Sequence, residues 1–402
     1  MIAVSSLLSL ANRVLEEAKM PRPTYCKNPM CPNHHSPPRH WYCLYGSYET
    51  MAHGRIQRFQ CRACGRTCSM QTESLHYYAK RHVPFEEIQK CLAGGSPMRE
   101  IARRYHLSPT AVANAVIRLG RQSMAAQLHL LHHLNPRTDL VFDGIRSCVT
   151  SQDFPCDLTT VVDRVGEVIL TITHTIFRRG GTMTEKQRER MAEKLAVWKP
   201  PLGSYTRSIS LLLREIWDYL RPSSSAPACI DTDEHILYAR LMHRDPITKH
   251  YFATGLLTHR RTPSTATRDR SNPLFPVNYI DRLIRHRVRE HMRETIAIGR
   301  NAVAQMHRLW IFAYDHNCRR EWRVRVPGEG VHAAQGSVDL SVIKRMNTQF
   351  YTRRIRITGV EIPESIYQVW MGTIDTPPHR WRAGQRGTDV HIPRFAVRDL
   401  VG

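Results

Sequence analysis

The run Leu140-Val141-Phe142-Asp143-Gly144 is the most informative stretch of this chain, because it combines a strand pattern with a carboxylate. β-Branched and aromatic residues favour a strand that is buried in a sheet. Two similar stretches follow, and the turn Arg164-Val165-Gly166 separates them. We therefore expect three consecutive strands, over 140–145, 157–164 and 166–174.

Helical and strand-like segments alternate after these strands. Apolar periodicity predicts helices over about 182–198 and 207–220, and a proline- and serine-rich stretch ends the second of them. We expect a fourth strand that reaches 231–233, a fifth strand near 250–258, and a long helix from about 278 to beyond 300. This alternation predicts a mixed α/β domain.

Carboxylates stand at the ends of two of these strands. Asp143 closes the first strand, and Gly144 leaves room beside it. Asp233 ends the fourth strand, and Asp231 competes with it for the same role. Carboxylates that converge from different parts of a chain can hold two divalent ions, which together activate the nucleophile and stabilise the leaving oxygen in phosphoryl transfer. We expect Asp143 and Asp233 to be catalytic ligands of Mg²⁺ or Mn²⁺.

A third carboxylate is expected from the long helix. Asp281 lies one turn into this helix and would point toward the site if the helix packs on the sheet. Glu290 and Glu294 are alternatives, but they lie roughly 13 to 20 Å further along the helix axis, so they cannot occupy the same place as Asp281. Their other role would be to pair with nearby arginines. Asp315 is a further alternative, and the choice stays open.

Four cysteines have the spacing of a structural zinc site. They form two pairs, Cys26-x4-Cys31 and Cys61-x2-Cys64, with a hairpin-like segment between them. A tight turn in each pair would bring two thiolates onto one ion and complete a tetrahedral site. A domain of about 50 residues has little core, so zinc would supply much of its folding free energy. His34 or His35 could replace a thiolate. We expect strands over 41–45 and 54–60.

Residues 85–122 have the apolar spacing of three short helices. Ser108 is a suitable N-cap, and Pro109 suits the first position of the third helix. The segment 109–119 is therefore the candidate recognition helix of a helix-turn-helix, and a generic helical bundle is the alternative. Its solvent side would present three side chains to phosphates and base edges, namely Thr110, Asn114 and Arg118.

The chain carries a large excess of positive charge. Among its 402 residues, 58 are Lys or Arg and 35 are Asp or Glu, which gives a formal net charge of +23. This excess favours a polyanionic partner, and we expect double-stranded DNA. Part of it lies just after Asp281, on four arginines that we expect to contact DNA phosphates: Arg282, Arg285, Arg289 and Arg293.

Composition also limits the environment of the protein. Hydrophobic residues make up 42%, which is typical of a globular chain. The eleven cysteines are scattered and do not form a disulfide framework, which favours a reducing compartment. No apolar run approaches the roughly 20 residues that span a bilayer. We expect a cytoplasmic, nucleoid-associated protein with no membrane partner.

These features divide the chain into five parts. The strand-like, basic character after Asn317 predicts that the last part is rich in β-structure and contacts DNA. The parts are an N-terminal amphipathic helix (1–20), a zinc module (21–72), a helix-turn-helix (73–128), an α/β catalytic domain (136–317, with a helical insertion at about 176–227) and a C-terminal β-rich basic region (318–402).

The stretch Arg58-Phe59-Gln60-Cys61-Arg62-Ala63-Cys64-Gly65-Arg66-Thr67, followed by the helix-turn-helix and the three acids, resembles bacterial insertion-sequence transposases of the DDE superfamily. Thr232-Asp233-Glu234-His235 looks like the second-acid motif of that family, and Tyr279-Ile280-Asp281-Arg282 looks like its third-acid helix. The resemblance covers roughly residues 24–317 and implies a zinc ribbon, a helix-turn-helix and a ribonuclease-H-like catalytic domain. The family usually has Glu at the third acid, whereas mariner-like branches use three aspartates.

The resemblance implies a transposase that binds the ends of a mobile element and catalyses metal-dependent strand cleavage and strand transfer. It also implies a homodimer or a higher synaptic assembly, because two DNA ends are joined together. Two alternatives remain. One is a transposase-derived DNA-binding regulator without catalysis, and the other is a nuclease of the same fold without strand transfer.

Overall fold

The computed structural model describes most of the chain, in two compact units. The described residues are 22–28, 30–134, 138–292, 297–323, 325, 328, 330–355, 357 and 361–378. The first unit comprises those up to Ile88 together with those of 344–357, and the second comprises the others, from Gln89 to Ile343 and from Glu361 onward. The predicted N-terminal helix, over 1–20, lies outside the described residues.

A small antiparallel sheet forms the centre of the first unit. Its three strands are β1 (Tyr42–Thr50), β2 (Gly54–Cys61) and β3 (Thr67–Ser69), in that order across the sheet. The four-residue helices α2 (Pro32–His35) and α3 (Met70–Glu73) come before and after it in the chain. The structure confirms both strands predicted for this part, although the first extends to Thr50, which pairs with Gly54 across the hairpin.

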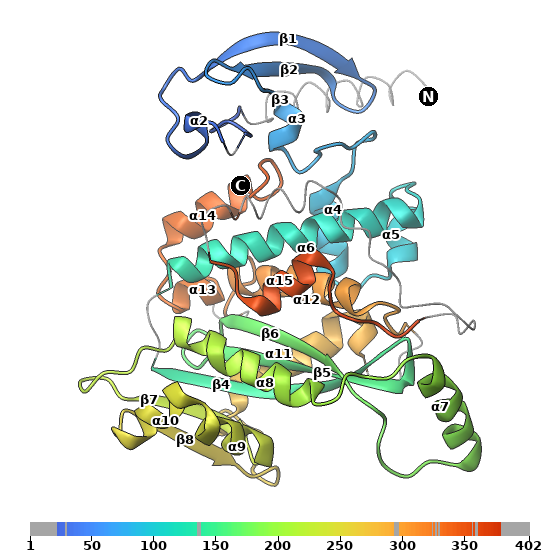
Figure 1. Ribbon diagram of the computed structural model, residues 1–402, viewed down its shortest axis with the longest axis vertical. Helices are drawn as coiled ribbons and strands as arrows, with labels where there is room; N and C mark the ends of the chain where they lie inside the picture. Colours follow the sequence, from blue (N-terminus) through green and yellow to red (C-terminus); the bar gives the residue numbers. More distant parts are fainter. Residues whose placement is uncertain are drawn as a thin grey trace. The chain divides into compact units, whose positions relative to one another are not determined.

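A five-stranded mixed sheet forms the centre of the second unit (Figure 1). Its strands are β4 (Asp139–Val149), β5 (Ser151–Asp163), β6 (Ile169–Ile176), β7 (Ala228–Asp233) and β8 (Leu257–Thr262). They lie in the order β6-β5-β4-β7-β8, with β4, β5 and β6 antiparallel and with β7 and β8 parallel to β4. The three consecutive strands and the fourth strand are therefore as predicted.

The core of the second unit covers one face of this sheet. Side chains of β4 such as Phe142 pack against α8 (Ser204–Glu215) and α9 (Ile236–Arg244). The insertion predicted at about 176–227 contains both α7 (Glu185–Val197) and α8. In Figure 1, α7 stands apart from α9, whereas the apolar side of α8 is part of the core. The helix α8 is thus a layer of the domain itself.

The three helices predicted over 85–122 are present, and the last is longer than expected. They are α4 (Phe85–Ala93), α5 (Met98–Arg104) and α6 (Pro109–His132). The second half of α6 is buried and packs along α12 (Ala302–Cys318) (Figure 1). Gly120 permits this approach, because a Cβ there would lie 2.4 Å from Nδ1 of His307. The candidate recognition helix therefore continues into the body of the second unit.

Two predictions in the second half of the chain are wrong. The long helix expected from 278 to beyond 300 is two helices, α11 (Phe275–Arg287) and α12, with the backbone extended at Val288. The strand expected near 250–258 is α10 (Pro246–Ala253) followed by β8. The aromatic residues of this segment suggested a strand. The Asp245 carboxylate, however, accepts the backbone N–H of Thr248 at 2.9 Å and so caps the start of a helix.

The prediction of a β-rich C-terminal region is also wrong for the part that is described. It contains the helices α13 (His332–Gln335), α14 (Leu340–Gln349) and α15 (Glu364–Met371), and no strand occurs among the described residues after Cys318. Apolar residues such as Ile343, Met346 and Phe350 recur at helical spacing, which basic neighbours obscure. Residues 379–402 lie outside the description. Of the described helices, none is long and apolar enough to cross a membrane.

Candidate active site and metal centre

Four cysteine thiols converge in the first unit. The Sγ atom of Cys26 is 3.4 Å from that of Cys64, and the Sγ atom of Cys31 is 3.7 Å from that of Cys61. All four sulfur atoms lie within 4.8 Å of one another, and only Cys64 is exposed. Four thiolates at such distances can adopt the tetrahedral arrangement of a structural metal site. The group could therefore hold a metal ion such as zinc.

Local turns place these thiols, which is why their spacing was informative. The backbone N–H of Gly65 donates to the carbonyl of Cys61 at 2.9 Å, and its φ of +69° is one that glycine adopts without strain. The alternative histidine ligands are not part of the group. Nδ1 of His34 lies 2.7 Å from the carbonyl oxygen of Cys26, and His35 is exposed.

Asp143, Asp233 and Asp281 approach one another in the second unit. The parallel ladder sets Val141 opposite Asp231, so two residues further along each strand Asp143 comes level with Asp233. Asp281 belongs to α11, which packs on β4 and β5. The carboxylate of Asp233 affects the pKa of Asp143, and the carboxylate of Asp143 affects the pKa of Asp281. The fold therefore brings the three predicted acids within electrostatic range.

Burial and mutual repulsion disfavour the charged forms of these acids. Burial, aided by the nearby Asp233 carboxylate, raises the pKa of Asp143 to about 7. Burial is also the main cause that raises the pKa of Asp281 well above its usual range, and the Asp143 carboxylate is the next. Both shifts have the direction expected of buried carboxylates near like charges, and the positive charges of Arg268 and Arg285 oppose them only in part.

The acids offer oxygen ligands that the protein itself does not use. Oδ1 of Asp281 is buried and has no hydrogen-bond partner, and Oδ1 of Asp143 accepts only the N–H of the adjacent Gly144, at 2.7 Å. Carboxylate oxygens suit hard cations such as Mg²⁺. Within the described residues, however, the cysteines are the only group of three or more ligands within 4.8 Å. The carboxylates thus stand further apart than a single ion requires.

The structure distinguishes Asp233 from its neighbour Asp231. The Asp231 carboxylate is fully buried and forms ion pairs with Arg164 and with Arg260, whose Nε lies 2.8 Å from Oδ1. Asp233 is partly exposed, and its Oδ1 accepts only the backbone N–H of His235, at 2.9 Å. Asp231 is therefore occupied by structural ion pairs, whereas Asp233 keeps lone pairs for another ligand.

The alternative third acids have other surroundings. Glu290 is buried and forms an ion pair with Arg308, whose Nε donates to Oε1 at 2.7 Å. Asp315 lies on α12, where burial raises its pKa and three arginines, Arg287 foremost, oppose that rise. Glu294 lies outside the described residues. Of the described candidates, Asp281 is the one whose carboxylate faces the other acids.

The predicted DNA-contacting residues lie on the surfaces of α6 and α11. Thr110 and Asn114 are exposed, and Arg118 is half-buried. On α11, Arg282 is exposed above the ring of Tyr279, and Arg285 is half-buried. The other two arginines are Arg289, which is exposed in the short turn after α11, and Arg293, which lies outside the described residues.

Sequence reasoning missed a further buried acid near these residues, Asp157 of β5. Burial raises the pKa of Asp157, and the Asp233 carboxylate adds to this effect. Arg146 pairs with it at 3.4 Å and lies over the rings of Phe177 and Tyr205. The signal for it in the sequence was a single acidic residue in a strand that is rich in β-branched residues, because acidic residues are rarely buried in such strands.

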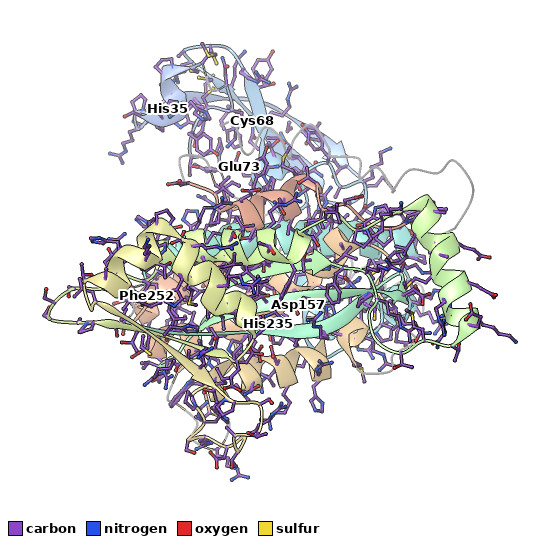
Figure 2. All side chains as sticks on the ribbon, turned by 60° about the horizontal axis from the view of Figure 1, so that its bottom comes forward. His35, Cys68, Glu73, Asp157, His235 and Phe252 are labelled. Carbon is purple, nitrogen blue, oxygen red and sulfur yellow. The ribbon has the colours of Figure 1, made fainter. Side chains whose placement is uncertain are left out.

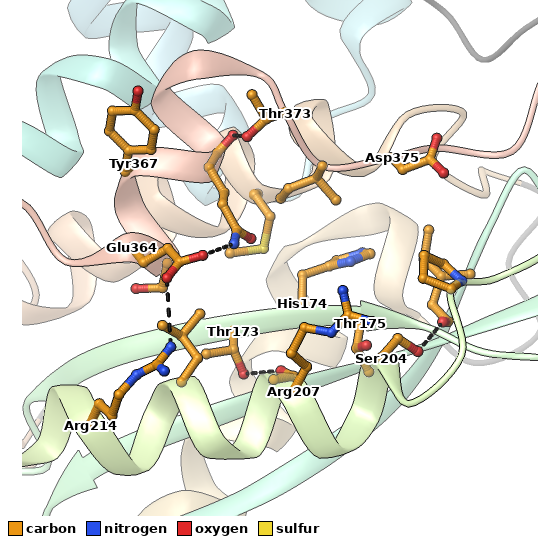
Figure 3. Close-up of a pocket in the computed structure, with 18 of the residues that line it drawn as sticks. Thr173, His174, Thr175, Ser204, Arg207, Arg214, Glu364, Tyr367, Thr373 and Asp375 are labelled. Carbon is orange, nitrogen blue, oxygen red and sulfur yellow. Dashed lines mark hydrogen bonds and ion pairs between the residues drawn. The ribbon is translucent and has the colours of Figure 1, made fainter.

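A cavity of about 600 Å³ lies elsewhere in the second unit, between β6, α8 and α15 (Figure 3). None of the predicted site residues lines it. Several of its polar groups bond to one another, as Ser208 does to Thr173 at 3.0 Å and Glu364 to Arg214 at 3.6 Å. The cavity is thus separate from the carboxylates.

No protein-family model matches the chain, and no curated protein matches its sequence significantly.

Proposed function

We propose that this chain is a DNA transposase that binds the ends of a mobile element and cleaves and transfers DNA strands with bound Mg²⁺ or Mn²⁺. The proposal rests on one observation above all: Asp143, on β4, lies within electrostatic range of Asp233, at the end of β7, and of Asp281, on α11. Carboxylates are not brought together in this way for stability, because their charges repel. A divalent cation would remove that repulsion.

The architecture around the acids supports a ribonuclease-H-like catalytic domain. Three antiparallel strands followed by two parallel ones, in the order β6-β5-β4-β7-β8, are the arrangement expected of that fold. Asp143 lies on the central strand, Asp233 ends the adjacent parallel strand, and Asp281 comes from a helix packed on the sheet. These are the positions that the resemblance assigns to the three acids.

We propose that the site holds two divalent ions about 4 Å apart, as two-metal phosphoryl transfer requires. When bound, such ions supply an activated hydroxyl nucleophile and stabilise the leaving 3′-oxygen. The chain's own contribution is to hold the carboxylates on rigid strands. Asp143, with its raised pKa, must release its proton when the cation binds.

Positive charge and exposed polar side chains support DNA as the substrate. The net charge of +23 favours a nucleic-acid partner, and α6 exposes Thr110 and Asn114 near its N-terminus. Arg282 and Arg289 are exposed beside the helix that carries Asp281. We propose that these arginines hold DNA phosphates next to the acids, and that two or more copies assemble on paired ends.

Incubating the full-length protein with Mg²⁺ or Mn²⁺ and duplex DNA that flanks its gene tests the proposal. Joined products are expected of a transposase, cut ends alone would indicate a nuclease, and a gel shift without cutting would indicate a regulator. Asp143→Asn should abolish cutting and leave DNA binding intact. Asp339→Asn is the matched control, because Asp339 is exposed and accepts the Ser341 N–H at 2.6 Å, which Asn can also do.

A further inference from the structure

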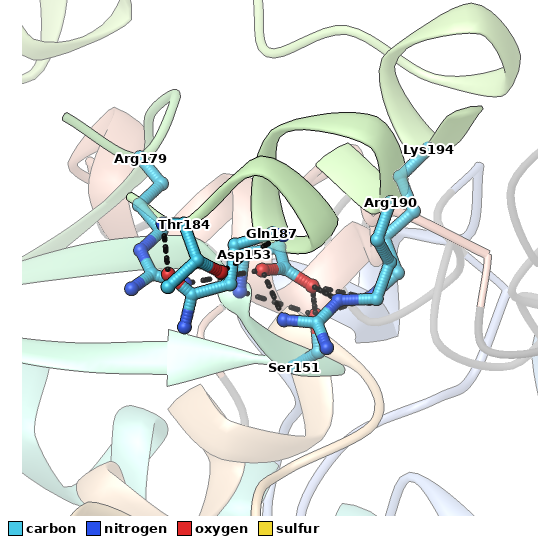
Figure 4. Close-up of polar contacts among 7 residues, drawn as sticks. All are labelled: Ser151, Asp153, Arg179, Thr184, Gln187, Arg190 and Lys194. Carbon is cyan, nitrogen blue, oxygen red and sulfur yellow. Dashed lines mark hydrogen bonds and ion pairs between the residues drawn. The ribbon is translucent and has the colours of Figure 1, made fainter. Parts of the chain in front are cut away.

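Three cationic side chains of the second unit gather on a single buried carboxylate, Asp153 of β5 (Figure 4). Arg190 and Lys194 belong to α7, and Arg179 belongs to the segment between β6 and this helix. Nε and Nη2 of Arg190 each lie 3.1 Å from one of the two Asp153 oxygens. Nζ of Lys194 lies 2.5 Å from Oδ2, and Nη1 of Arg179 lies 3.4 Å from Oδ1. These four residues form what we call the α7 cluster.

The charges of the α7 cluster do not balance. Three positive charges face one negative charge, so two positive charges are in excess. Neither Arg179 nor Arg190 has a second carboxylate partner among the described residues. Glu193, which is one turn from Arg190 on α7, is exposed and does not pair with it. A bound anion would neutralise this excess.

The arginines of the cluster are accessible, although the carboxylate beneath them is not. The side chain of Asp153 is 1% exposed, whereas those of Arg190 and Arg179 are 44% and 21% exposed. Both arginines keep N–H donors that Asp153 does not use, because Nη1 of Arg190 and Nη2 of Arg179 have no hydrogen-bond partner among the described residues. The chain beside Arg179 is also open, since a Cβ on Gly180 or Gly181 would have no atom within 4 Å.

Attachment of α7 to the sheet does not require three cations. Arg190 alone contacts both oxygens of Asp153. Apolar contacts also hold the helix, because Met191 is buried and the ring centroid of Trp198, at the end of α7, lies 5.3 Å from that of Phe154. Each further cation adds repulsion to the cluster. A structural role alone therefore does not explain the excess charge.

The α7 cluster lies near the acids of the candidate active site. Asp157 comes four residues after Asp153 on β5, so at most about 14 Å of extended chain separates them. Asp157 lies next to His235, which is two residues beyond Asp233 (Figure 2). A DNA duplex carries one phosphate per roughly 1.7 Å of its axis. One duplex can therefore reach the acids and place another of its phosphates at the cluster.

We infer that Arg179, Arg190 and Lys194, held together by Asp153, form a binding site for a phosphate group of the DNA backbone. The choice of DNA as the partner rests on the proposed function. Guanidinium groups suit phosphate because their N–H donors match its oxygens in pairs. Asp153 is a positioning residue, which orients the cations and does not touch the phosphate. A phosphate contact of this kind fixes the position of the duplex without reading its sequence.

Binding of a fluorescent duplex of arbitrary sequence to the full-length, zinc-replete protein tests this inference. Fluorescence anisotropy would be measured at several salt concentrations without added divalent cation. Arg179→Gln should weaken binding about fivefold to tenfold at roughly 0.1 M salt and lower the slope of log Kd against log salt by about 0.9, which is the share of one phosphate contact. Arg179→Lys keeps the charge and should retain most of the affinity. Arg188→Gln is the matched control, because Arg188 is exposed on α7 and pairs with Glu185 outside the cluster.

The possible outcomes separate this inference from the proposed function. If the wild type binds the duplex and Arg179→Gln binds it equally well at every salt concentration, only this inference fails. Equal weakening by Arg188→Gln would also overturn it, because the effect would then be one of overall charge. If inorganic phosphate raises the melting temperature of the wild type but not of Arg179→Gln, while both bind the duplex equally, the site takes free phosphate and not DNA.

A wild-type protein that binds no duplex would overturn the proposed function together with this inference. Circular dichroism would check the folding of every variant. Should Arg179→Gln not fold, Lys194→Gln decides the matter, because it removes another cation of the same cluster and should weaken binding in the same way.

Discussion

The cysteine group and the carboxylate group are built in opposite ways. Cys26 and Cys64 are 38 residues apart, and short turns within one small unit bring all four thiols within 4.8 Å. Asp143 and Asp281 come from a strand and a helix that only the folded sheet brings near one another. The first set depends on local chain geometry, and the second depends on the register of a sheet.

The difference shows what each site needs from the rest of the protein. The cysteine group has a small core around it, consisting mainly of Trp41 and the cysteines themselves, so a metal would contribute much of the stability. The carboxylates lie beside a large core that folds around Phe142 and its neighbours. Their mutual repulsion is a cost that this core offsets. We therefore expect the first unit to need the metal of the cysteine group in order to fold. The second unit should need metal at its carboxylates only for the activity proposed above.

Removing the metal from the cysteine group should have the largest effect. Cys61→Ser, or a strong chelator, should unfold the first unit, because structural zinc contributes roughly 10 kcal/mol or more in small modules. The second unit should keep its unfolding transition. Zinc content by atomic absorption and limited proteolysis of residues 22–88 would measure this. A Cys61→Ser protein that resists protease in this region as the wild type does would contradict the expectation. Cys43→Ser is the control, since Cys43 is outside the group.

The second-largest effect should be a difference in the free energy of unfolding between variants of the two aspartates at the end of β7. Asp231→Ala leaves Arg164 and Arg260 without their buried partner, and breaking such pairs typically costs roughly 3–5 kcal/mol. Asp233→Ala should change the free energy of unfolding little, because Asp233 is partly exposed and has no ion pair among the described residues. Urea denaturation of the second unit compares them. Equal losses for the two variants would show that Asp233 also has a structural role.

The sequence was sufficient where local chemistry decides the structure. Spacing and turns predicted the cysteine group, and β-branched runs predicted β4, β5 and β6. It favoured Asp233 over Asp231 but could not show what occupies Asp231, because one of its ion-pair partners, Arg164, is 67 residues away. The predicted end of the recognition helix, at residue 119, was wrong for the same reason. The side chain of His307, on the distant helix α12, packs against Gly120, where a Cβ would clash with it.

The missed carboxylate has the same explanation. Asp157 resembles an isolated polar residue in a strand, and only the register of β4 and β5 reveals that it covers Gly144. The C-terminal strands were predicted incorrectly because the sequence pattern there is weak. Ile343, Met346 and Phe350 recur at helical spacing, but the basic and β-branched residues between and around them favour a strand. Long-range contacts therefore determined most of what the sequence did not predict.

The pH dependence of stability should reveal the repulsion among the carboxylates. The pKa of Asp143 is about 7 in the folded chain and near the ordinary aspartate value of 3.8 in the unfolded chain, so between these pH values the folded state holds a proton that the unfolded state has lost. The contribution of Asp143 to stability should consequently fall as the pH rises from about 4 to 7, by roughly 2–4 kcal/mol at most. Histidines such as His174, His291 and His307, whose pKa values burial lowers, contribute in the opposite direction, so the effect of Asp143 is measured relative to Asp143→Asn.

Unfolding of the second unit at pH 5 and pH 8, with and without added Mg²⁺, would measure this loss. Mg²⁺ should restore stability at pH 8 and have less effect at pH 5, where Asp143 keeps its proton. Asp143→Asn should reduce the fall in stability without abolishing it, because burial also raises the pKa of Asp281 and of Asp157. If the stability of the wild type relative to Asp143→Asn does not fall between pH 5 and pH 8 without Mg²⁺, the repulsion is contradicted.

The smallest effect is expected at the start of α6, where a local feature meets a long-range one. The Ser108 hydroxyl accepts the backbone N–H of Ala111 at 3.1 Å and caps the helix. Ser108→Ala should cost about 1 kcal/mol, because loss of an N-cap usually has that size. The rest of α6 is held by α12, so fraying should stop within the turn that carries Thr110. Amide hydrogen exchange would locate it. Ser108→Asp, which also caps and suits the positive helix end, should exchange like the wild type; fraying that reaches the buried half of α6 would show that local capping, rather than α12, holds this helix.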